Sequence, residues 1–149
     1  NVKYLHNEIG KILGIDRENN LIVIGGGHLG QAIANYANFE RRGFYIKAIF
    51  DIDPEIIGKE VRGVRVYSMD ELEDFIKKND IHIAALAIPK LQAEEVAKRL
   101  VAAGIVGIWN YAHIDLQVPD NVVVENVHLS ESLMRLSYRV NREMDKTKK

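Results

Sequence analysis

Hydrophobic and polar residues follow two periods along this chain, and the changes of period divide it into strands and helices. Nearly continuous apolar runs predict strands covered on both faces, and apolar positions three or four residues apart predict helices. Strands are predicted at residues 21–24, 44–51, 61–67, 81–88, 105–109 and 122–124. Helices are predicted at residues 2–13, 70–78, 90–103 and 128–143, and in a segment that ends near residue 41.

Strands that alternate with helices form right-handed βαβ units, so we expect an α/β fold with a Rossmann-type, doubly wound, mostly parallel sheet. Local signals support several boundaries. Ser68 and Glu71 have capping-box spacing, and Gly104 is suited to end the helix before it. Pro54 opens a turn or a short helix that reaches residue 58. A length of 149 residues is typical of one domain.

A group of glycines lies directly after the first strand, where residues 21–30 read LIVIGGGHLG. The spacing of Gly25, Gly27 and Gly30 is the dinucleotide-binding fingerprint. The first glycine makes a tight turn, the second lets the backbone approach a pyrophosphate, and the third lets the next helix pack closely on the sheet. A structural glycine turn without a ligand is the alternative interpretation.

Two carboxylates follow the second strand: Asp51, about twenty residues after the glycines, and then Asp53. Such a carboxylate accepts hydrogen bonds from the hydroxyls of an adenosine ribose. It also repels a 2′-phosphate, which favours NAD(H) over NADP(H). The alternative is that the Asp-x-Asp-Pro sequence forms a turn that caps the next segment.

Composition and charge narrow the class of function. The net charge of −1 indicates no basic surface for nucleic acid or an anionic membrane. The chain has no cysteine, which excludes disulfides and thiolate metal sites. It shows neither an apolar run of membrane-spanning length nor a signal-peptide pattern, so we expect a cytoplasmic protein without a membrane partner.

No pair of nucleophile and base is evident, and one helix is all that follows the sheet, so there is no room for a substrate domain. We therefore expect a nucleotide sensor or a fragment, and not a complete enzyme such as an oxidoreductase. Three histidines, His28, His113 and His128, are predicted near the strand ends. They come from separate segments without the spacing of metal ligands, so no metal is expected.

Five segments read, in order, GGGHLGQAIANY, FDIDPEIIGKEVRGVRVY, AIPKLQAEEVAKRLVAAGIVGIWNYA, LQVPDNVVVENV and SLMRLSY. In sequence and spacing they resemble the Rex family of redox-sensing transcriptional repressors. The resemblance covers nearly the whole chain and is more specific than the glycine motif. It implies that the cofactor is NAD(H), and that a raised NADH/NAD⁺ ratio releases the repressor from operator DNA.

The motifs and the resemblance together assign cofactor contacts to the glycine loop, the aspartate pair, a tyrosine on the next helix and the ends of later strands. These residues are Gly25, Gly26, Gly27, His28, Leu29, Gly30, Tyr36, Asp51, Asp53, Ile88, Pro89, Asn110, Tyr111, Ala112, His113 and His128.

Two of these positions depart from the family pattern. The family usually has proline at the position of His113 and aspartate at that of His128, close to the nicotinamide. A protonated histidine there disfavours the positively charged oxidised ring more than the neutral reduced one. We therefore expect any preference for NADH to strengthen as the pH falls through the histidine range.

The family also implies a domain organisation, in which a winged-helix domain binds operator DNA and a swapped C-terminal helix forms a homodimer. We accordingly expect residues 1–18 to be a linker helix after an absent winged-helix domain, which truncation explains better than a natural domain-only protein. Residues 19–127 then form the NAD(H)-binding domain, and residues 128–149 form the dimerisation helix and a basic tail. Operator DNA would bind only through the absent domain. A cofactor-binding fragment of a dehydrogenase and a CoA-binding Rossmann domain stay open as alternatives.

Overall fold

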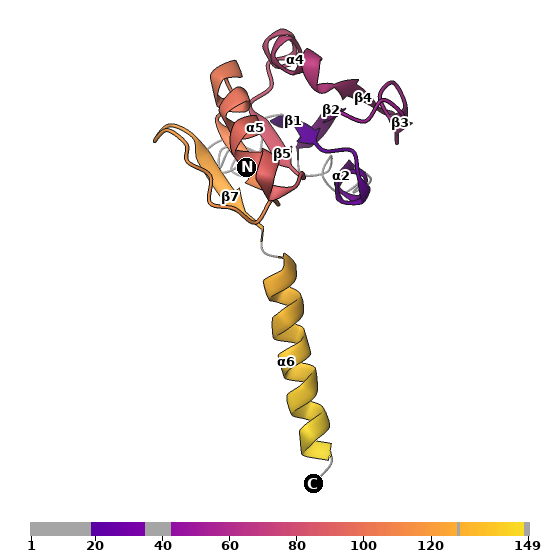
Figure 1. The fold of residues 1–149 in the computed structure, drawn as a ribbon, viewed down its shortest axis with the longest axis vertical. Coiled ribbons are helices and arrows are strands. Elements are labelled where there is room, and N and C mark those ends of the chain that lie inside the picture. The colour runs from indigo at the N-terminus through magenta and orange to yellow at the C-terminus, as the bar shows by residue number, and fades with distance from the viewer. Residues whose placement is uncertain (1–18, 35–42, 128, 148–149) are drawn as a thin grey trace, which may run out of the picture.

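The structure is a computed structural model that describes residues 19–34, 43–127 and 129–147. Within these ranges, seven strands form one sheet in the order β3-β4-β2-β1-β5-β6-β7 (Figure 1). The strands are β1 (Asn19–Ile24), β2 (Phe44–Asp51), β3 (Glu60–Val61), β4 (Val64–Ser68), β5 (Ile83–Leu86), β6 (Gly107–Asn110) and β7 (Val123–Asn126). The helices are α2 (His28–Ala34), the 3₁₀-helix η1 (Met69–Glu71), α4 (Leu72–Asn79), α5 (Lys90–Ala103) and α6 (Leu129–Thr147).

The sheet is parallel except at the edge formed by β3, as the hydrophobic pattern predicts. One prediction was wrong: residues 61–67 are not a single extended segment but the greater part of the antiparallel β3–β4 hairpin. Arg62 and Gly63 occupy its turn with φ angles of 52° and 81°. Two successive positive φ values match the right-handed twist of the paired strands, which explains the hairpin.

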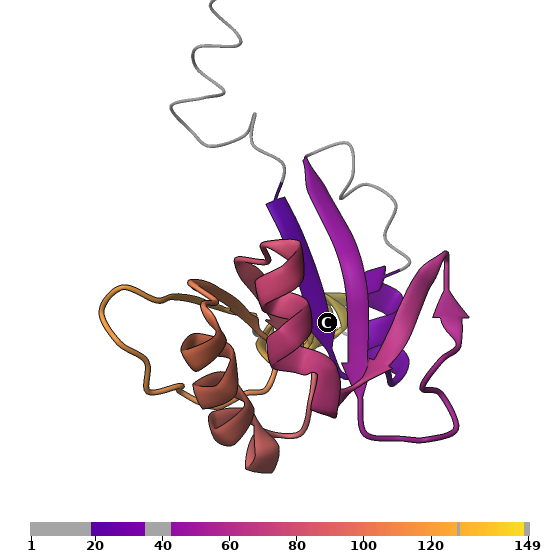
Figure 2. The ribbon, with the colours of Figure 1, turned by 90° about the horizontal axis from the view of Figure 1, so that it is seen from above.

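The two faces of the sheet carry separate apolar layers. Helices α4 and α5 lie over one face, and α2 lies over the other (Figure 2). Along β1, Ile22 and Ile24 join the layer beneath α4 and α5, whereas Leu21 and Val23 join the layer beside α2. This alternation is the period of a strand, and both faces are apolar because helices cover both. The strand β1 is therefore the buried centre of the sheet.

Residues 111–122 connect β6 to the parallel strand β7 without a helix. Three side chains of this connection, Ile114, Leu116 and Val118, pack on the layer that contains α4 and α5. They supply the apolar cover that a crossover helix gives elsewhere in the sheet. The carboxyl end of β6 is thus followed by an irregular segment and not by a helix.

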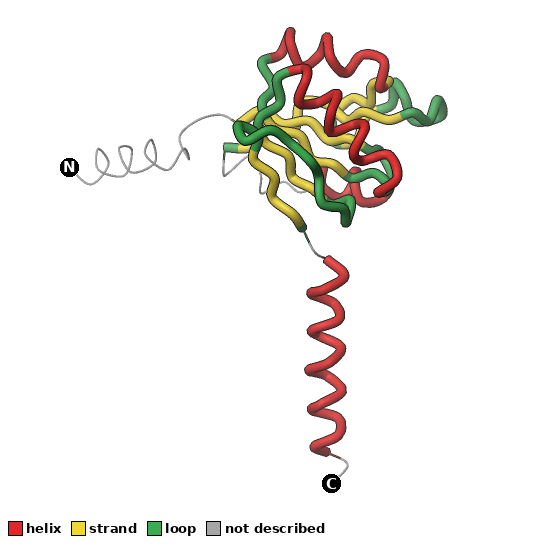
Figure 3. Tube along the Cα trace, turned by 60° about the vertical axis from the view of Figure 1, so that its left-hand side comes forward, coloured by secondary structure: helices red, strands yellow, loops and turns green. Residues whose placement is uncertain are grey.

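The helix α6 extends away from the sheet (Figures 1 and 3). It is longer than the predicted segment and ends at Thr147. Its apolar side chains Leu133, Leu136, Val140 and Met144 are 48–67% exposed. In the described part of the chain, no helix combines the length and the apolar character that a membrane span requires.

Several predicted boundaries are confirmed. The strand β2 covers residues 44–51, Ser68 and Glu71 form both hydrogen bonds of a capping box, and Gly104 ends α5 with a φ of 111°. The segment after Pro54 is a turn, not a helix. The expected helix at residues 2–13, and the helical residues expected from 35 to 41, lie outside the described residues.

Candidate functional site

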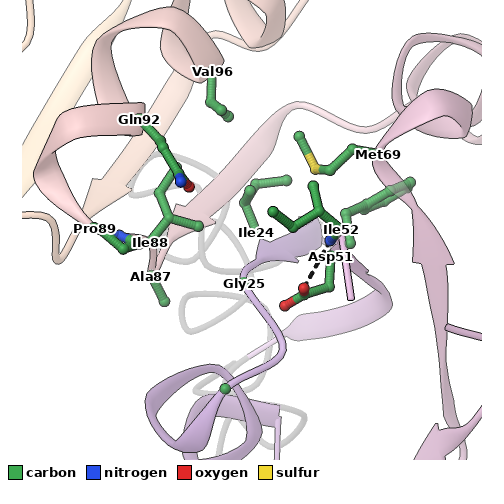
Figure 4. Close-up of a pocket in the computed structure, with 12 residues that line it drawn as sticks. Ile24, Gly25, Asp51, Ile52, Met69, Ala87, Ile88, Pro89, Gln92 and Val96 are labelled. Carbon is green, nitrogen blue, oxygen red and sulfur yellow. Dashed lines mark hydrogen bonds between the residues drawn. The ribbon is translucent and has the colours of Figure 1, made fainter. Parts of the chain in front are cut away.

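A pocket of about 340 Å³ lies where the carboxyl ends of β1, β2 and β5 meet (Figure 4). The three ends are joined by backbone hydrogen bonds, from Gly25 N to the Phe50 carbonyl (2.8 Å) and from Ala87 N to the Ile24 carbonyl (2.8 Å). The pocket is lined by Ile24, Gly25, Gly27, Phe50, Asp51, Ile52, Met69, Ala87, Ile88, Pro89, Gln92 and Val96. In parallel α/β sheets this edge is where ligands bind.

The three fingerprint glycines have different surroundings, and those of Gly25 and Gly30 match the expected turn and close helix packing. Gly25 has a φ of 107°, and a Cβ there would clash with the carbonyl oxygen of Ala87. A Cβ on Gly30 would clash with the carbonyl oxygen of Gly25, so Gly30 lets α2 lie close to the strand end. A Cβ on Gly27 would meet nothing within 4 Å. The backbone at Gly27 therefore faces open space, into which a ligand group can fit.

The carboxylate of Asp51 is fixed over this loop by three backbone donors. Its Oδ2 accepts a hydrogen bond from Gly26 N (2.5 Å), and its Oδ1 accepts from Ile52 N (2.7 Å) and Asp53 N (2.9 Å). An ionised carboxylate offers about four acceptor positions, so Asp51 retains capacity for one more donor. Its position and orientation do not depend on a ligand.

The second aspartate fits the alternative interpretation. Asp53 Oδ1 accepts a hydrogen bond from Glu55 N (3.0 Å), and the Asp53 carbonyl accepts from Ile56 N and Ile57 N (both 3.2 Å). Asp53 thus caps the turn after Pro54 and does not line the pocket. The two aspartates therefore differ, with Asp51 at the pocket and Asp53 in the turn.

The end of β6 forms a second group of predicted residues, beside the pocket and not among its lining residues. Asn110 is 1% exposed, and its Nδ2 donates to the Ile114 carbonyl (2.8 Å) and to Asn126 Oδ1 (2.9 Å). Its Oδ1 accepts from Ala112 N (3.0 Å). The side chain is therefore committed to shaping the turn that follows it.

Two aromatic side chains flank Asn110 in the sequence and pack edge to face. The ring centroids of Trp109 and Tyr111 are 4.9 Å apart. Burial raises the pKa of the Tyr111 phenol, so that phenol stays neutral at physiological pH. His113 is exposed and has a φ of 55° at the end of the turn.

The structure brings Gly25, Gly27, Asp51, Ile88 and Pro89 together at the pocket. Of the other predicted residues, Gly26, His28, Leu29 and Gly30 belong to the adjoining loop and the start of α2, and Asn110, Tyr111, Ala112 and His113 belong to the neighbouring strand end. Tyr36 and His128 lie outside the described residues. Among the described residues, no cluster of three or more His, Cys, Asp or Glu side chains is arranged to hold a metal ion.

Seven lining residues are not among the individually predicted cofactor contacts: Ile24, Phe50, Ile52, Met69, Ala87, Gln92 and Val96. A helical signal was available for two of them, because Gln92 and Val96 follow Pro89 at the spacing of successive turns on one face of α5. Met69 had no such signal. It reaches the pocket because η1 begins immediately after β4, and β4 pairs with β2.

Comparison with known proteins agrees with this geometry. A family model described as a CoA binding domain matches residues 16–114. A redox-sensing transcriptional repressor Rex from Clostridioides difficile (strain 630) is 59% identical over 138 residues, which are 93% of this chain and 66% of that protein. The chain thus spans about two thirds of the length of this curated relative.

Solved structures of RSP, a Rex-family repressor, are also similar to this chain. Its complex with β-NADH has a TM-score of 0.86 and 53% identity, covering 99% of this chain and 72% of that one. Its complex with β-NAD⁺ and operator DNA has the same TM-score and identity, covering 99% of this chain and 68% of that one. The Rossmann-type sheet, the glycine loop and these relatives lead to one conclusion: the chain belongs to the Rex family of redox-sensing transcriptional repressors.

Proposed function

We propose that this chain is the NAD(H)-binding sensor part of a redox-sensing repressor, in which NADH binding releases the full-length dimer from operator DNA. The observation that carries the proposal is the open backbone at Gly27, held between the tight turn of Gly25 and the fixed carboxylate of Asp51. The solved complexes of RSP with NADH, and with NAD⁺ and operator DNA, support it.

The pocket fits the adenosine half of this ligand. Its volume of about 340 Å³ lies in the range of small-molecule sites, and its walls are mostly apolar. A pyrophosphate fits against the backbone at Gly27, where a Cβ would enter open space. The remaining acceptor position of Asp51 suits a ribose hydroxyl, and its negative charge disfavours a phosphate on that ribose.

The nicotinamide half belongs, in this proposal, at the turn after β6. Asn110 ends β6 and residues 111–113 lead into that turn. Tyr36 and His128, which lie outside the described residues, are proposed as further contacts on the family resemblance alone. When bound, the nicotinamide reports the cellular redox state, because its oxidised ring carries a positive charge and its reduced ring does not. Moving the charged ring out of water costs free energy that the neutral ring avoids. A protonated His113 or His128 adds to this difference.

We further propose that α6 forms the homodimer interface. The side chains of Leu133, Leu136, Val140 and Met144 form one stripe on this helix and are exposed in the single chain. An amphipathic helix with an uncovered apolar stripe gains free energy when a partner buries that stripe. Operator DNA would bind through a winged-helix domain outside residues 1–149, and the repressor would act in the cytoplasm without a membrane partner.

Calorimetric titration with NADH, NAD⁺ and CoA tests the proposal, together with light scattering for the oligomeric state. We expect NADH to bind to a dimer, NAD⁺ to bind more weakly, and no nucleotide to be consumed. CoA is included because the matching family model is described by that ligand. Tight CoA binding without NADH binding would overturn the proposal.

A further inference from the structure

The pocket has two polar side chains among its lining residues, Asp51 and Gln92, and the proposed function uses only Asp51. Gln92 lies on the first turn of α5, across the pocket from β2 (Figure 4). Its carboxamide is directed toward the space between the two walls. The other lining side chains are apolar, apart from the glycines that have none. Gln92 is exposed at the mouth of the pocket, so its amide is available to a ligand that enters there.

The backbone holds Gln92 in place without using its amide. Gln92 N donates a hydrogen bond to the Pro89 carbonyl (3.1 Å), and the next residue, Ala93, is fully buried against the sheet. One turn further along α5, Val96 lines the same wall of the pocket. The amide thus projects from a fixed point in the helix, while its own donor and acceptor groups face the pocket.

The apolar surfaces around Gln92 form a slot suited to a flat ring. Ile88 and Val96 line one side of it, and Ile52 and Met69 line the other (Figure 4). An adenine ring presents apolar faces and a polar edge, on which the amino group N6 donates and N7 accepts. A carboxamide carries one acceptor and one donor at matching separation, so Gln pairs with this edge through two hydrogen bonds.

We propose that Gln92 reads the adenine edge and makes this pocket specific for the adenine base of the nucleotide. This inference rests on the proposed function, because it assumes that NAD(H) occupies the pocket. It adds a specificity-determining residue: Asp51 selects at the ribose, and Gln92 selects at the base. Hypoxanthine differs from adenine by an oxygen acceptor in place of the N6 donor, so Gln92 can form only one of the two hydrogen bonds with it.

The test is calorimetric titration of the full chain with NADH and with reduced nicotinamide hypoxanthine dinucleotide. We expect the wild-type chain to bind NADH about tenfold more tightly than the hypoxanthine analogue, the discrimination typical of a two-bond contact. In Gln92→Met, which retains the volume and the helical propensity, we expect NADH to bind about tenfold more weakly and the preference between bases to disappear. Gln117→Met makes the same change outside the pocket and should behave as wild type.

The outcomes separate the two proposals. If the wild-type chain binds NADH but binds the hypoxanthine analogue equally well, the role of Gln92 is overturned and the proposed function stands. A preference for adenine that persists in Gln92→Met overturns the role of Gln92 as well. If the wild-type chain binds no NADH, the proposed function fails and this inference fails with it. Thermal melting of both variants shows that each is folded at the titration temperature.

Discussion

Replacing Asn110 with leucine should destabilise the domain more than its position at the end of a strand suggests. Asn110 is 1% exposed, and its side chain forms three hydrogen bonds, to the Ile114 carbonyl, to Asn126 Oδ1 and from Ala112 N. Leucine has the same branched shape with bulkier end groups, so the variant removes these hydrogen bonds without leaving a cavity. All three bonds are lost together.

The expected loss follows from the surroundings of each partner. A hydrogen bond contributes about 1 kcal/mol, which gives about 3 kcal/mol for three. In the variant, the exposed side chain of Asn126 can form a hydrogen bond to water instead. Ala112 is only 4% exposed, so its backbone N–H stays unpaired at a cost of about 1–3 kcal/mol. We therefore expect the free energy of unfolding to fall by at least about 3 kcal/mol. For a domain of this size, a loss of about 3 kcal/mol corresponds to a fall of about 6–12 °C in Tm. This is less than the whole stability of a typical domain, so the variant should still fold.

Urea unfolding followed by circular dichroism measures the change in the free energy of unfolding. Asn79→Leu is the matched control, because Asn79 is exposed and its amide bonds only to the Phe75 carbonyl (3.0 Å). We expect this control to lie within about 0.5 kcal/mol of wild type. If Asn110→Leu also lies within that range, with an unchanged m-value, the reasoning about the buried amide is refuted.

Three further predictions concern the ligand loop, an ion pair and the dimer. Gly27→Ala should keep the stability of wild type but bind NADH at least about tenfold more weakly by calorimetry, because the added methyl enters the open space that we propose for the pyrophosphate. Glu73→Gln should lower the free energy of unfolding by about 1 kcal/mol or less at pH 7, since the Arg99–Glu73 pair is 35% and 40% exposed. The hydrogen bond from Arg99 lowers the pKa of Glu73 from its ordinary value, so this difference should shrink in urea titrations as the pH falls through that lowered pKa. Replacing Leu133 and Leu136 together with serine should convert the proposed dimer to a monomer in light scattering, because both side chains belong to the exposed stripe of α6.

Each of these changes has a control in the same chain. Gly30→Ala should destabilise the fold, because its Cβ would clash with the backbone of Gly25, whereas Gly27→Ala should not. Glu143→Gln removes the exposed pair with Lys146 and should leave stability unchanged at every pH. Arg135→Ser changes a charged residue of α6 and should leave the dimer intact. Equal NADH affinity of Gly27→Ala and wild type, a pH-independent effect of Glu73→Gln, or a dimer that survives both serines would each contradict its prediction.

Local sequence determined the elements whose signals lie within one turn or one strand. The strand β2, the capping box of Ser68 and Glu71, and the end of α5 at Gly104 agree with prediction, because each depends on neighbouring residues alone. The three fingerprint glycines belong to the same class. Their local roles follow from backbone sterics at the end of a buried strand. The resemblance to the Rex family likewise rests on short sequence segments that follow one another in the family's order.

The tertiary structure decided the features that depend on distant segments. The pocket forms because β1, β2 and β5 end side by side, and no local pattern states which strands are neighbours. The pairing of β4 with β2, and of β5 with β1, likewise brings Met69 and Gln92 to one slot. The hairpin of β3 and β4 also required the sheet, because a short apolar run is compatible with one strand or two. Sequence thus determined which residues could bind a dinucleotide, and packing of the strand ends decided which of them share a site, because strand order is set by contacts between residues far apart in the chain.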